Sequence, residues 1–394
     1  MILTRKQEEG LKIAIDRYRN HEPYTCVAGY AGTGKSTLIR FIIQALKLES
    51  WQVCYIAYTG KAVQVLRSKG CPNSKTAHKL LYNTKMNEDG TFIHIPKDRD
   101  PMYKVIVVDE VSMLPKHMWD LLLKWHTYVI ALGDPGQLPP VAAQNNGVLN
   151  HPHVFLDEIM RQAQDSEIIR LATAIREEKY LAPYRGKEVR IVDNKELQAP
   201  GFLQWADQII VGKNATRHQI NGIMRKLLYG ENILEPVKGD KVICLDNDWG
   251  CLNTTNDPLV NGLDGWIENI EYSSMPHPYL EKLPFITFKP NLEGATSFND
   301  LLIDYSLITE HKSVYDIYGY EVINRMTLEN WLTPKPFDYA YAITCHKSQG
   351  SEYDKVIVME EKLQGMSKEE YKKWLYTAVT RAAKKLIVVR DKFV

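Results

Sequence analysis

Near the start of the chain, the segment GYAGTGKST lies between a short apolar run and a stretch with helical periodicity. It fits the pattern G-x-x-x-x-G-K-[ST], in which small residues let backbone N–H groups surround phosphate oxygens at a helix N-terminus. Lys35 would reach the β- and γ-phosphates, and Ser36 would offer its hydroxyl to Mg²⁺. The segment lacks the G-x-G-x-x-G fingerprint of dinucleotide sites, so it predicts a nucleoside triphosphate site. Its predicted nucleotide contacts are Gly29, Ala31, Gly32, Thr33, Gly34, Lys35, Ser36 and Thr37.

Two adjacent carboxylates, Asp109 and Glu110, follow the apolar run VIVV. Ligands of α/β proteins bind at the carboxyl ends of parallel strands, so Asp109 is predicted to hold Mg²⁺ and Glu110 to polarise the attacking water. Such a pair can also be a simple helix cap, but the phosphate loop upstream favours the catalytic interpretation. A general base indicates hydrolysis rather than nucleotide storage. A switch GTPase would need a guanine-reading N-K-x-D motif, which the sequence lacks.

The segment LGDPGQLPPV follows the next apolar run. Asp-Pro-Gly is typical of a turn, and the functional interpretation makes Gln137 a γ-phosphate sensor on this loop. Near the C-terminus, CHKSQGSEYD could hold a nucleophile with its base, half a metal site, or a polar loop. No acidic orienter or second ligand cluster accompanies Cys345 and His346, which disfavours the first two.

Several apolar runs alternate with stretches of helical periodicity, and this rhythm predicts parallel α/β sheets that position these loops. Residues 240–335 are richer in Asn, Gly and Pro and contain short β-like runs, so we expect an inserted β domain there. Residues 85–103 predict a short hairpin, with its Asp-Gly dipeptide in the turn.

The composition of the 394-residue chain is that of a globular protein, with 44% hydrophobic and 25% charged residues. Its 49 basic and 48 acidic residues leave a net charge of +1, so any nucleic-acid surface must be a local stripe. The six cysteines form no C-x-x-C pair and predict reduced thiols rather than zinc ribbons or disulfides. No signal peptide or membrane-spanning run is evident, so we expect a cytoplasmic protein.

The order of Gly29–Thr37, Asp109–Glu110 and Gly133–Val141 resembles the first half of a superfamily 1 helicase. YTGKAVQVL and TAHKLL resemble single-strand contacts of its first motor domain. LDEIMRQAQDSEIIRLATAIR, CHKSQGSEYDKVIV and LYTAVTRAAKKLIVV resemble motifs of its second. The chain is most similar to the RecD-like and Dda-like group, DNA helicases that step 5′ to 3′.

This resemblance implies two RecA-like parallel-sheet motor domains that bind ATP between them. A β-hairpin pin would be inserted in the first motor domain, and a small β-barrel in the second. The implied boundaries are 1–84 with 104–155, the pin at 85–103, 156–240 with 336–394, and the barrel at 241–335.

Several nucleotide-site roles follow from the resemblance alone. Arg161 and Arg381 correspond to arginine fingers, and Gly350 and Glu352 to nucleotide contacts, Glu352 at the ribose. Gln7 corresponds to an adenine-reading glutamine, but Thr4 and Gln7 also fit a helix capping box. We expect Gln7 to read adenine only if it gives up the hydrogen bond of the capping box to the backbone of Thr4.

The DNA contacts would use hydroxyls, amides and a few cations that can release the backbone at each step, with stacking surfaces for bases. Phe92 could be the wedge of the pin or could serve local packing. Residues 344–348 would face DNA, and 349–352 the nucleotide, which makes this a two-sided coupling loop. The predicted DNA contacts are Thr59, Lys61, Thr76, His78, Phe92, Pro140, Thr344, His346, Lys347 and Ser348.

The predicted function is an ATP-driven, Mg²⁺-dependent helicase that moves 5′ to 3′ on single-stranded and forked DNA. We expect a monomer in a bacterial or phage-infected cell, with a single-strand-binding protein or replication and recombination proteins as candidate partners. One alternative is a single-strand translocase without strong unwinding. Others are a nucleotide-gated binding subunit of a larger complex, and a protein that acts on RNA, since only 2′-hydroxyl contacts separate RNA from DNA.

Overall fold

The computed structural model divides the chain into two compact units, 1–212 with 345–394 and 213–344. The residues that it describes are 3–86, 92–98, 102–139, 146–160, 164–179, 182–231, 233, 235–255, 257–272, 284–292, 294–304 and 334–390. In the first unit, no described helix is both long and apolar enough to cross a membrane, and the same holds for the described part of the second.

The first sheet has the strand order β3-β2-β6-β7-β1-β8, and its described strand pairs are parallel. Its strands are β1 (Tyr24–Gly29), β2 (Val53–Ala57), β3 (Ser74–Thr76), β6 (Val105–Val108), β7 (Tyr128–Gly133) and β8 (Val154–Leu156). The helices around it are α1 (Arg5–Arg19), α2 (Lys35–Ala45), α3 (Gly60–Ser68), α4 (Ala77–Leu81) and α5 (Lys116–Leu123).

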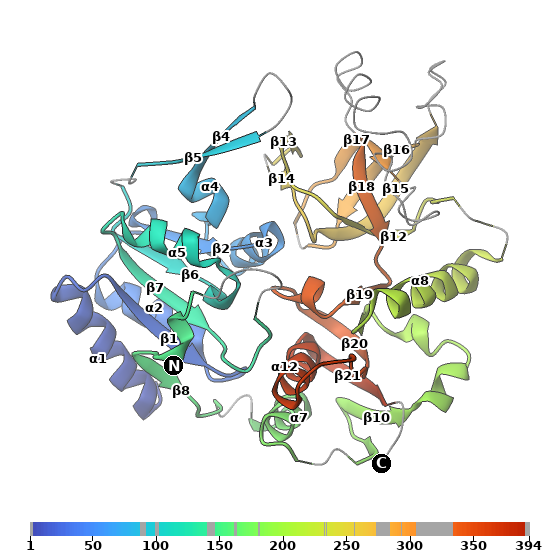
Figure 1. Ribbon diagram of the computed structural model, residues 1–394, viewed down its shortest axis with the longest axis horizontal. Coiled ribbons are helices and arrows are strands. Elements are labelled where there is room, and N and C mark those ends of the chain that lie inside the picture. Colours follow the sequence, from blue (N-terminus) through green and yellow to red (C-terminus); the bar gives the residue numbers. More distant parts are fainter. Residues whose placement is uncertain are drawn as a thin grey trace. The chain divides into compact units, whose positions relative to one another are not determined.

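Both faces of this sheet are covered, which explains why its strands read as unbroken apolar runs. In β6, Val105 and Val107 join the core cluster built with α1 and α2, whereas Ile106 and Val108 join the cluster built with α4 and α5. Figure 1 shows α1 and α2 on one face of the sheet and α5 on the other. The polar residues after each strand therefore gather at one edge of the sheet.

The hairpin insertion consists of β4 (Tyr82–Met86) and β5 (Phe92–Pro96), paired antiparallel with Tyr82 opposite Pro96 and Met86 opposite Phe92. A hairpin is confirmed, and its first strand begins ahead of the predicted start at residue 85. The predicted Asp-Gly turn lies outside the described residues.

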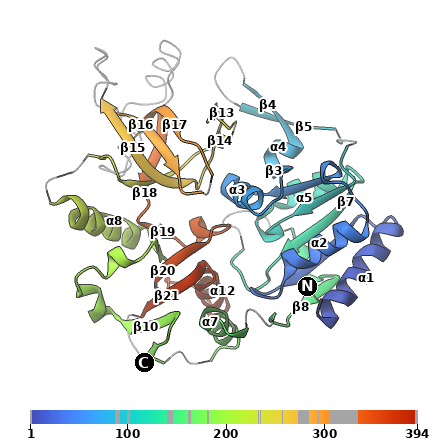
Figure 2. The same ribbon diagram turned by 180° about the vertical axis from the view of Figure 1, so that it is seen from behind.

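The second sheet of the first unit contains β11 (Gln208–Val211), β20 (Tyr353–Met359), β21 (Ala382–Arg390), β10 (Val189–Asp193) and β9 (Tyr184–Arg185), in that order. These strands are parallel except for β9. The helices α7 (Glu167–Arg176) and α12 (Lys368–Val379) pack against each other beside it, as Figure 2 shows from behind.

The second unit contains a closed barrel of β12 (Lys241–Cys244), β15 (Asp264–Tyr272), β16 (Pro284–Pro290), β17 (Phe298–Asp304) and β18 (Lys335–Tyr339). Phe288, Phe298 and Phe337 are fully buried and contact one another inside it. A small pair, β13 (Asp248–Leu252) with β14 (Pro258–Leu259), and the short β19 (Ala342–Thr344) complete the strands described there.

Helix α8 (Asn214–Tyr229) belongs to the same unit as the barrel. Its Arg225 is ion-paired with the buried Asp240 at 3.0 Å, and its Arg217 with Asp338 at 2.7 Å. The compact unit therefore begins at Lys213, ahead of the predicted barrel boundary at 241. Two parallel sheets, a hairpin and a closed barrel confirm the predicted fold class, while the predicted domain limits themselves remain a prediction.

Candidate functional site

The phosphate loop connects β1 to α2, as its sequence predicts. Gly32 and Gly34 have φ values of 76° and 79°, a left-handed conformation that glycine adopts without strain. The Lys35 ammonium is folded back onto the loop and donates to the carbonyl oxygens of Gly29 at 2.6 Å and Tyr30 at 3.0 Å. Burial lowers the pKa of Lys35, with nearby carboxylates, Asp134 foremost, opposing that shift. A phosphate chain would give this half-buried cation a better partner than two carbonyl groups.

Gln7 is fully buried and serves two purposes at once. Its Oε1 accepts from the Thr4 backbone N–H at 3.0 Å, which completes the capping box of α1. Its Nε2 donates to the carbonyl oxygens of Thr33 at 3.2 Å and Gly34 at 3.4 Å. Gln7 therefore caps α1 and contacts the phosphate loop through opposite ends of one amide, while its reading of adenine stays a prediction.

The carboxylates Asp109 and Glu110 follow β6 at the sheet edge, where the strand order places them next to the loop after β7. Glu110 has φ 47° and ψ 53°, a left-handed conformation that is strained for a residue with a Cβ. Its backbone N–H donates to Asp109 Oδ1 at 3.0 Å. Burial raises the pKa of both carboxyl groups above their ordinary values. A carboxylate with a raised pKa is the kind of group that enzymes use as a general base.

Arg381 lies immediately after α12 and its side chain is buried. Its Nε donates to the Thr377 carbonyl at 3.1 Å and its Nη1 to the Ser351 carbonyl at 3.2 Å. Nη1 also lies 3.9 Å from Glu110 Oε1, and this guanidinium opposes the rise in the pKa of Glu110. The arrangement fixes the head of a predicted arginine finger beside the predicted general base.

The loop after β7 is tied to α12 by hydrogen bonds that the sequence did not predict. The Tyr376 hydroxyl donates to Asp134 Oδ2 at 2.8 Å and accepts from the backbone N–H of Ala31, in the phosphate loop, at 2.8 Å. The Leu138 N–H donates to Thr377 Oγ1 at 2.9 Å, and Gln349 Nε2 donates to the Leu138 carbonyl at 2.8 Å. The only sequence signal for Tyr376 and Thr377 was their place in LYTAVTRA, where Arg381 alone was predicted to have a role.

Gln137, the predicted γ-phosphate sensor, is half-buried on this same loop, and its N–H donates to the Asp134 carbonyl at 3.2 Å. Ser36 is exposed and Thr37 half-buried at the start of α2. The hydroxyl of Ser36 and the carboxylate of Asp109 are hard oxygen ligands of the type Mg²⁺ prefers.

Gly350, in the polar loop, lies near both the predicted general base Glu110 and the predicted DNA contact Thr59. Its φ is 75°, and a Cβ placed on it would lie 3.4 Å from Glu110 Oε2, 3.6 Å from Thr59 Oγ1 and 3.1 Å from Ala62 Cβ. The loop thus passes between a predicted catalytic carboxylate and a predicted DNA contact. Glu352 instead points to Lys69, 3.7 Å away, with both side chains largely exposed.

The predicted DNA contacts differ in how much of each side chain is accessible. Thr59 and Thr76 cap α3 and α4 through their hydroxyls. Lys61 is buried, with its ammonium 2.9 Å from the Tyr353 hydroxyl. Ser348 is fully buried and donates to the Cys345 carbonyl at 2.7 Å, so its side chain does not face a groove in this conformation, contrary to the expectation.

His78 is half-buried, and its ring lies 5.6 Å from that of Tyr58 and 6.0 Å from that of His94. Burial lowers the pKa of His78 to about 4 and also lowers the pKa of His346. Both rings are therefore neutral at pH 7 and suited to stacking or hydrogen bonding. Thr344, His346 and Lys347 are half-buried.

Three predicted site residues cannot be placed in this way. Arg161 and Pro140 lie outside the described residues, and of Phe92 only its position in β5 is described.

Two known protein families match the segments that contain most of the predicted site residues. Residues 3–195 match the family described as an AAA domain, and residues 339–389 match the UvrD-like helicase C-terminal domain. The ATP-dependent DNA helicase dda of Enterobacteria phage T4 is 28% identical over 193 residues, which cover 45% of this chain and 43% of that protein. The ATP-dependent RecD2 DNA helicase of Deinococcus radiodurans is 25% identical over 403 residues, which cover 96% of this chain and 47% of that protein.

Each of these two matches therefore spans less than half the length of the relative. Among solved structures, the Pif1 helicase from Bacteroides in complex with ADP-AlF3 and ssDNA has a TM-score of 0.55 at 17% identity. That match covers 100% of this chain and 93% of the Pif1 chain and supports a common fold. The two matching family models and the similarity to dda and RecD2 support a superfamily 1 helicase of the Dda-like and RecD-like group.

Proposed function

We propose that this protein is an ATP-dependent DNA helicase that hydrolyses Mg-ATP and moves 5′ to 3′ along single-stranded DNA. The observation that carries the proposal is the position of Arg381 Nη1 at 3.9 Å from Glu110 Oε1, beside a phosphate loop whose half-buried lysine is held by carbonyl groups. This combination supplies a phosphate cradle, a general base and a transition-state cation, the parts that phosphoryl transfer requires. The DNA substrate and the direction of movement rest on membership of the Dda-like and RecD-like group.

In the proposed reaction, backbone N–H groups of the loop hold the β- and γ-phosphates, and Lys35 leaves its carbonyl partners for them. Glu110 orients a water whose oxygen bonds to the γ-phosphorus as the bond to the β–γ bridging oxygen breaks. Arg381 faces the charge that develops on the γ-phosphoryl oxygens. Mg²⁺, held by Ser36 and Asp109, would neutralise phosphate charge when bound.

Gln7 is proposed to read the adenine from its buried place on the loop, since its Nε2 already contacts the carbonyls of Thr33 and Gly34. Arg161 is proposed as the second arginine finger and Glu352 as the ribose contact.

DNA is proposed to act on hydrolysis through the loop of residues 344–352. Gly350 packs against Ala62 and lies beside both Thr59 and Glu110. If bound DNA shifts Thr59 at the start of α3, it therefore also shifts the surroundings of the general base Glu110. Alternating grip by the two motor domains would then convert each hydrolysis into a step. Opening a base-pair step costs on the order of 1.4 kcal/mol of stacking, a small load for one ATP.

A monomer with single-strand-binding, replication or recombination proteins as partners is the proposed working state. The alternative within the same chemistry is a single-strand translocase, or the ATPase subunit of a larger complex, that does not unwind strongly.

The experiment that tests the proposal is ATP hydrolysis by the purified chain with and without oligo-dT. Strong stimulation by oligo-dT, lost in Lys35→Ala, is expected. A rate that ignores oligo-dT would favour a nucleotide-gated binding subunit, and stimulation by oligo-U alone would favour RNA.

A further inference from the structure

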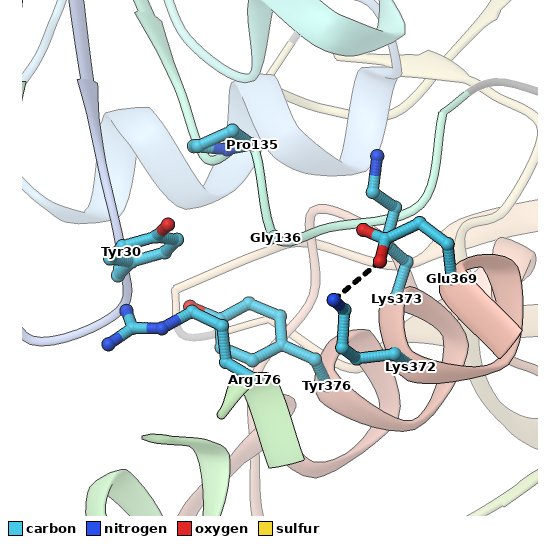
Figure 3. Close-up of a pocket in the computed structure, with 8 residues that line it drawn as sticks. All are labelled: Tyr30, Pro135, Gly136, Arg176, Glu369, Lys372, Lys373 and Tyr376. Carbon is cyan, nitrogen blue, oxygen red and sulfur yellow. Dashed lines mark ion pairs between the residues drawn. The ribbon is translucent and has the colours of Figure 1, made fainter. Parts of the chain in front are cut away.

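A pocket of about 200 Å³ lies next to the phosphate loop, on the side of α7 and α12. Tyr30, which follows Gly29 in the loop, forms one wall, and Gly136, of the loop after β7, forms another. Arg176 from α7 and Lys373 from α12 also line it, as Figure 3 shows. The volume holds a tetrahedral anion with part of its hydration shell, because a water molecule takes about 30 Å³.

The charged groups of this pocket are mainly cationic. Arg176, Lys372 and Lys373 line it together with one carboxylate, that of Glu369. Lys372 is ion-paired with Glu369, the contact dashed in Figure 3, and lies 3.4 Å from Glu178. The Arg176 guanidinium lies over the Tyr30 ring, 3.5 Å from its centroid. In the part of the chain that the structure describes, neither Arg176 nor Lys373 forms an ion pair, and the carboxylates of Asp157 and Glu177 interact with Arg176 only at longer range. Both charges are therefore available to an anion.

Tyr376 links this pocket to the backbone of the phosphate loop at Ala31. Its ring lines the pocket, while its hydroxyl accepts from the Ala31 N–H and donates to Asp134. Burial raises the pKa of Tyr376 above its ordinary value, so the phenol remains protonated and keeps its bond to the carboxylate. A nucleotide phosphate that takes the Ala31 N–H would release the hydroxyl from the loop and leave it bound to Asp134 alone.

We propose that this pocket is an exit site for inorganic phosphate, which it takes up after hydrolysis, and that Tyr376 is the gate. The inference rests on the proposed ATP hydrolysis and adds a product site to it. Hydrolysis leaves a free phosphate ion beside the β-phosphate of ADP, and the two anions repel each other. Arg176 and Lys373 offer the freed ion two cations that form no ion pair among the described residues, in the pocket that Tyr376 also lines.

Phosphate binding can be measured apart from hydrolysis. The protein is first saturated with ADP and aluminium fluoride, so that the phosphate loop is filled, and inorganic phosphate is then titrated by calorimetry. One saturable site per chain is expected, weakened about tenfold or more in the double variant Arg176→Gln with Lys373→Gln, because charged hydrogen bonds are lost. Lys368→Gln is the control: it removes one positive charge, one fewer than the double variant, from a residue of α12 that pairs with Glu178 and does not line this pocket. No saturable site, or equal affinity in all three proteins, would overturn the proposal.

The same proteins then separate cleavage from release. Rapid-quench measurements report cleavage of ATP, and a fluorescent phosphate sensor reports release. The double variant should cleave at the wild-type rate and release phosphate at least about fivefold more slowly, while Lys368→Gln releases normally.

Tyr376→Phe keeps the ring and removes the hydroxyl, so release should be as fast as in wild type or faster. Slower release with normal cleavage would contradict the gate. If wild type does not hydrolyse ATP, the proposed function fails as well. If wild type hydrolyses ATP and responds to oligo-dT, but the double variant releases phosphate at the wild-type rate, only the exit site fails.

Discussion

The guanidinium of Arg381 and the carboxylate of Glu110 lie 3.9 Å apart, and the Arg381 side chain is held by its own hydrogen bonds rather than by Glu110. Arg381 donates to the carbonyls of Thr377 and Ser351, and the backbone of Glu110 is in a left-handed conformation. A separation of this size is longer than a tight ion pair and leaves both groups available to a third partner between them. The γ-phosphate and its attacking water are that partner in our account.

Replacing Arg381 by Ala should lower the rate of ATP hydrolysis about 10³–10⁵-fold, the usual contribution of an arginine finger. Nucleotide binding, measured with a fluorescent ATP analogue, should weaken far less than the rate falls. Arg381→Lys is the control, because it keeps a charge but not the bonds to Thr377 and Ser351. A loss below about tenfold in Arg381→Ala would mean that Arg381 serves only to fix the end of α12.

The raised pKa of Glu110 predicts how hydrolysis depends on pH. A general base acts in its deprotonated form, so the rate falls as the pH drops through the folded-state pKa. Because burial raises that pKa, the acid limb should lie above the ordinary value of about 4.3 for a glutamate. Single-turnover rates measured from pH 3.5 to 8 check this, and an acid limb at or below about 4.3 would contradict it.

The same shift predicts that Glu110→Gln stabilises the fold at neutral pH. A carboxyl whose folded-state pKa is raised binds more protons folded than unfolded, so its charged form costs stability as the pH rises through that window. Removing the charge removes the cost. The variant should therefore unfold at a higher temperature than wild type at pH 7.5, and the difference should shrink toward pH 4.5. An unchanged difference across this range would show that Glu110 is not desolvated.

The two roles of Gln7 can be separated by comparing Gln7→Ala with Thr4→Ala. Both variants lose the capping box, which is worth about 0.5–2 kcal/mol of stability. Only Gln7→Ala also loses the contacts of Nε2 with Thr33 and Gly34. Both should be destabilised, but only Gln7→Ala should raise the KM for ATP and relax selectivity against GTP. Equal KM values in the two variants would restrict Gln7 to capping.

Gly350→Ala tests the coupling loop. The new Cβ would require a left-handed conformation, which costs on the order of 1 kcal/mol, and would lie near Ala62, Glu110 and Thr59. We expect basal hydrolysis within about threefold of wild type, with most of the stimulation by oligo-dT lost. Gly365→Ala is a matched control, since Gly365 has φ 80° and no neighbouring atom lies within 4 Å of the position that its Cβ would take. Proportional losses of basal and stimulated rates would contradict coupling through this loop.

The sequence predicted those features that depend on local pattern. The closed barrel was implied by the family resemblance, whereas the phosphate loop, the acidic pair after β6, the hairpin and the inserted β domain follow from short motifs or from local composition. The same holds for the capping box of Thr4 and Gln7, which is a relation over one helical turn.

The features that the sequence did not predict depend on contacts between distant residues. Nothing local indicates that the hydroxyl of Tyr376 meets the backbone of Ala31, or that Lys61 is buried against Tyr353. The place of α8 beside the barrel depends on Arg225 and Asp240, whose pairing no periodicity shows. The bond from Gln7 to the phosphate loop was not predicted either, because it joins residues 26 positions apart, whereas the capping bond spans one helical turn.

The most direct test of the central claim is an unwinding assay on duplexes that carry a single-stranded tail at one end only. With Mg-ATP, the protein should separate the duplex with a 5′ tail and leave the one with a 3′ tail intact, and Glu110→Gln should separate neither. Unwinding from the 3′ tail alone would contradict the proposed direction of movement. Hydrolysis stimulated by oligo-dT without unwinding of either duplex would contradict the helicase and leave a single-strand translocase.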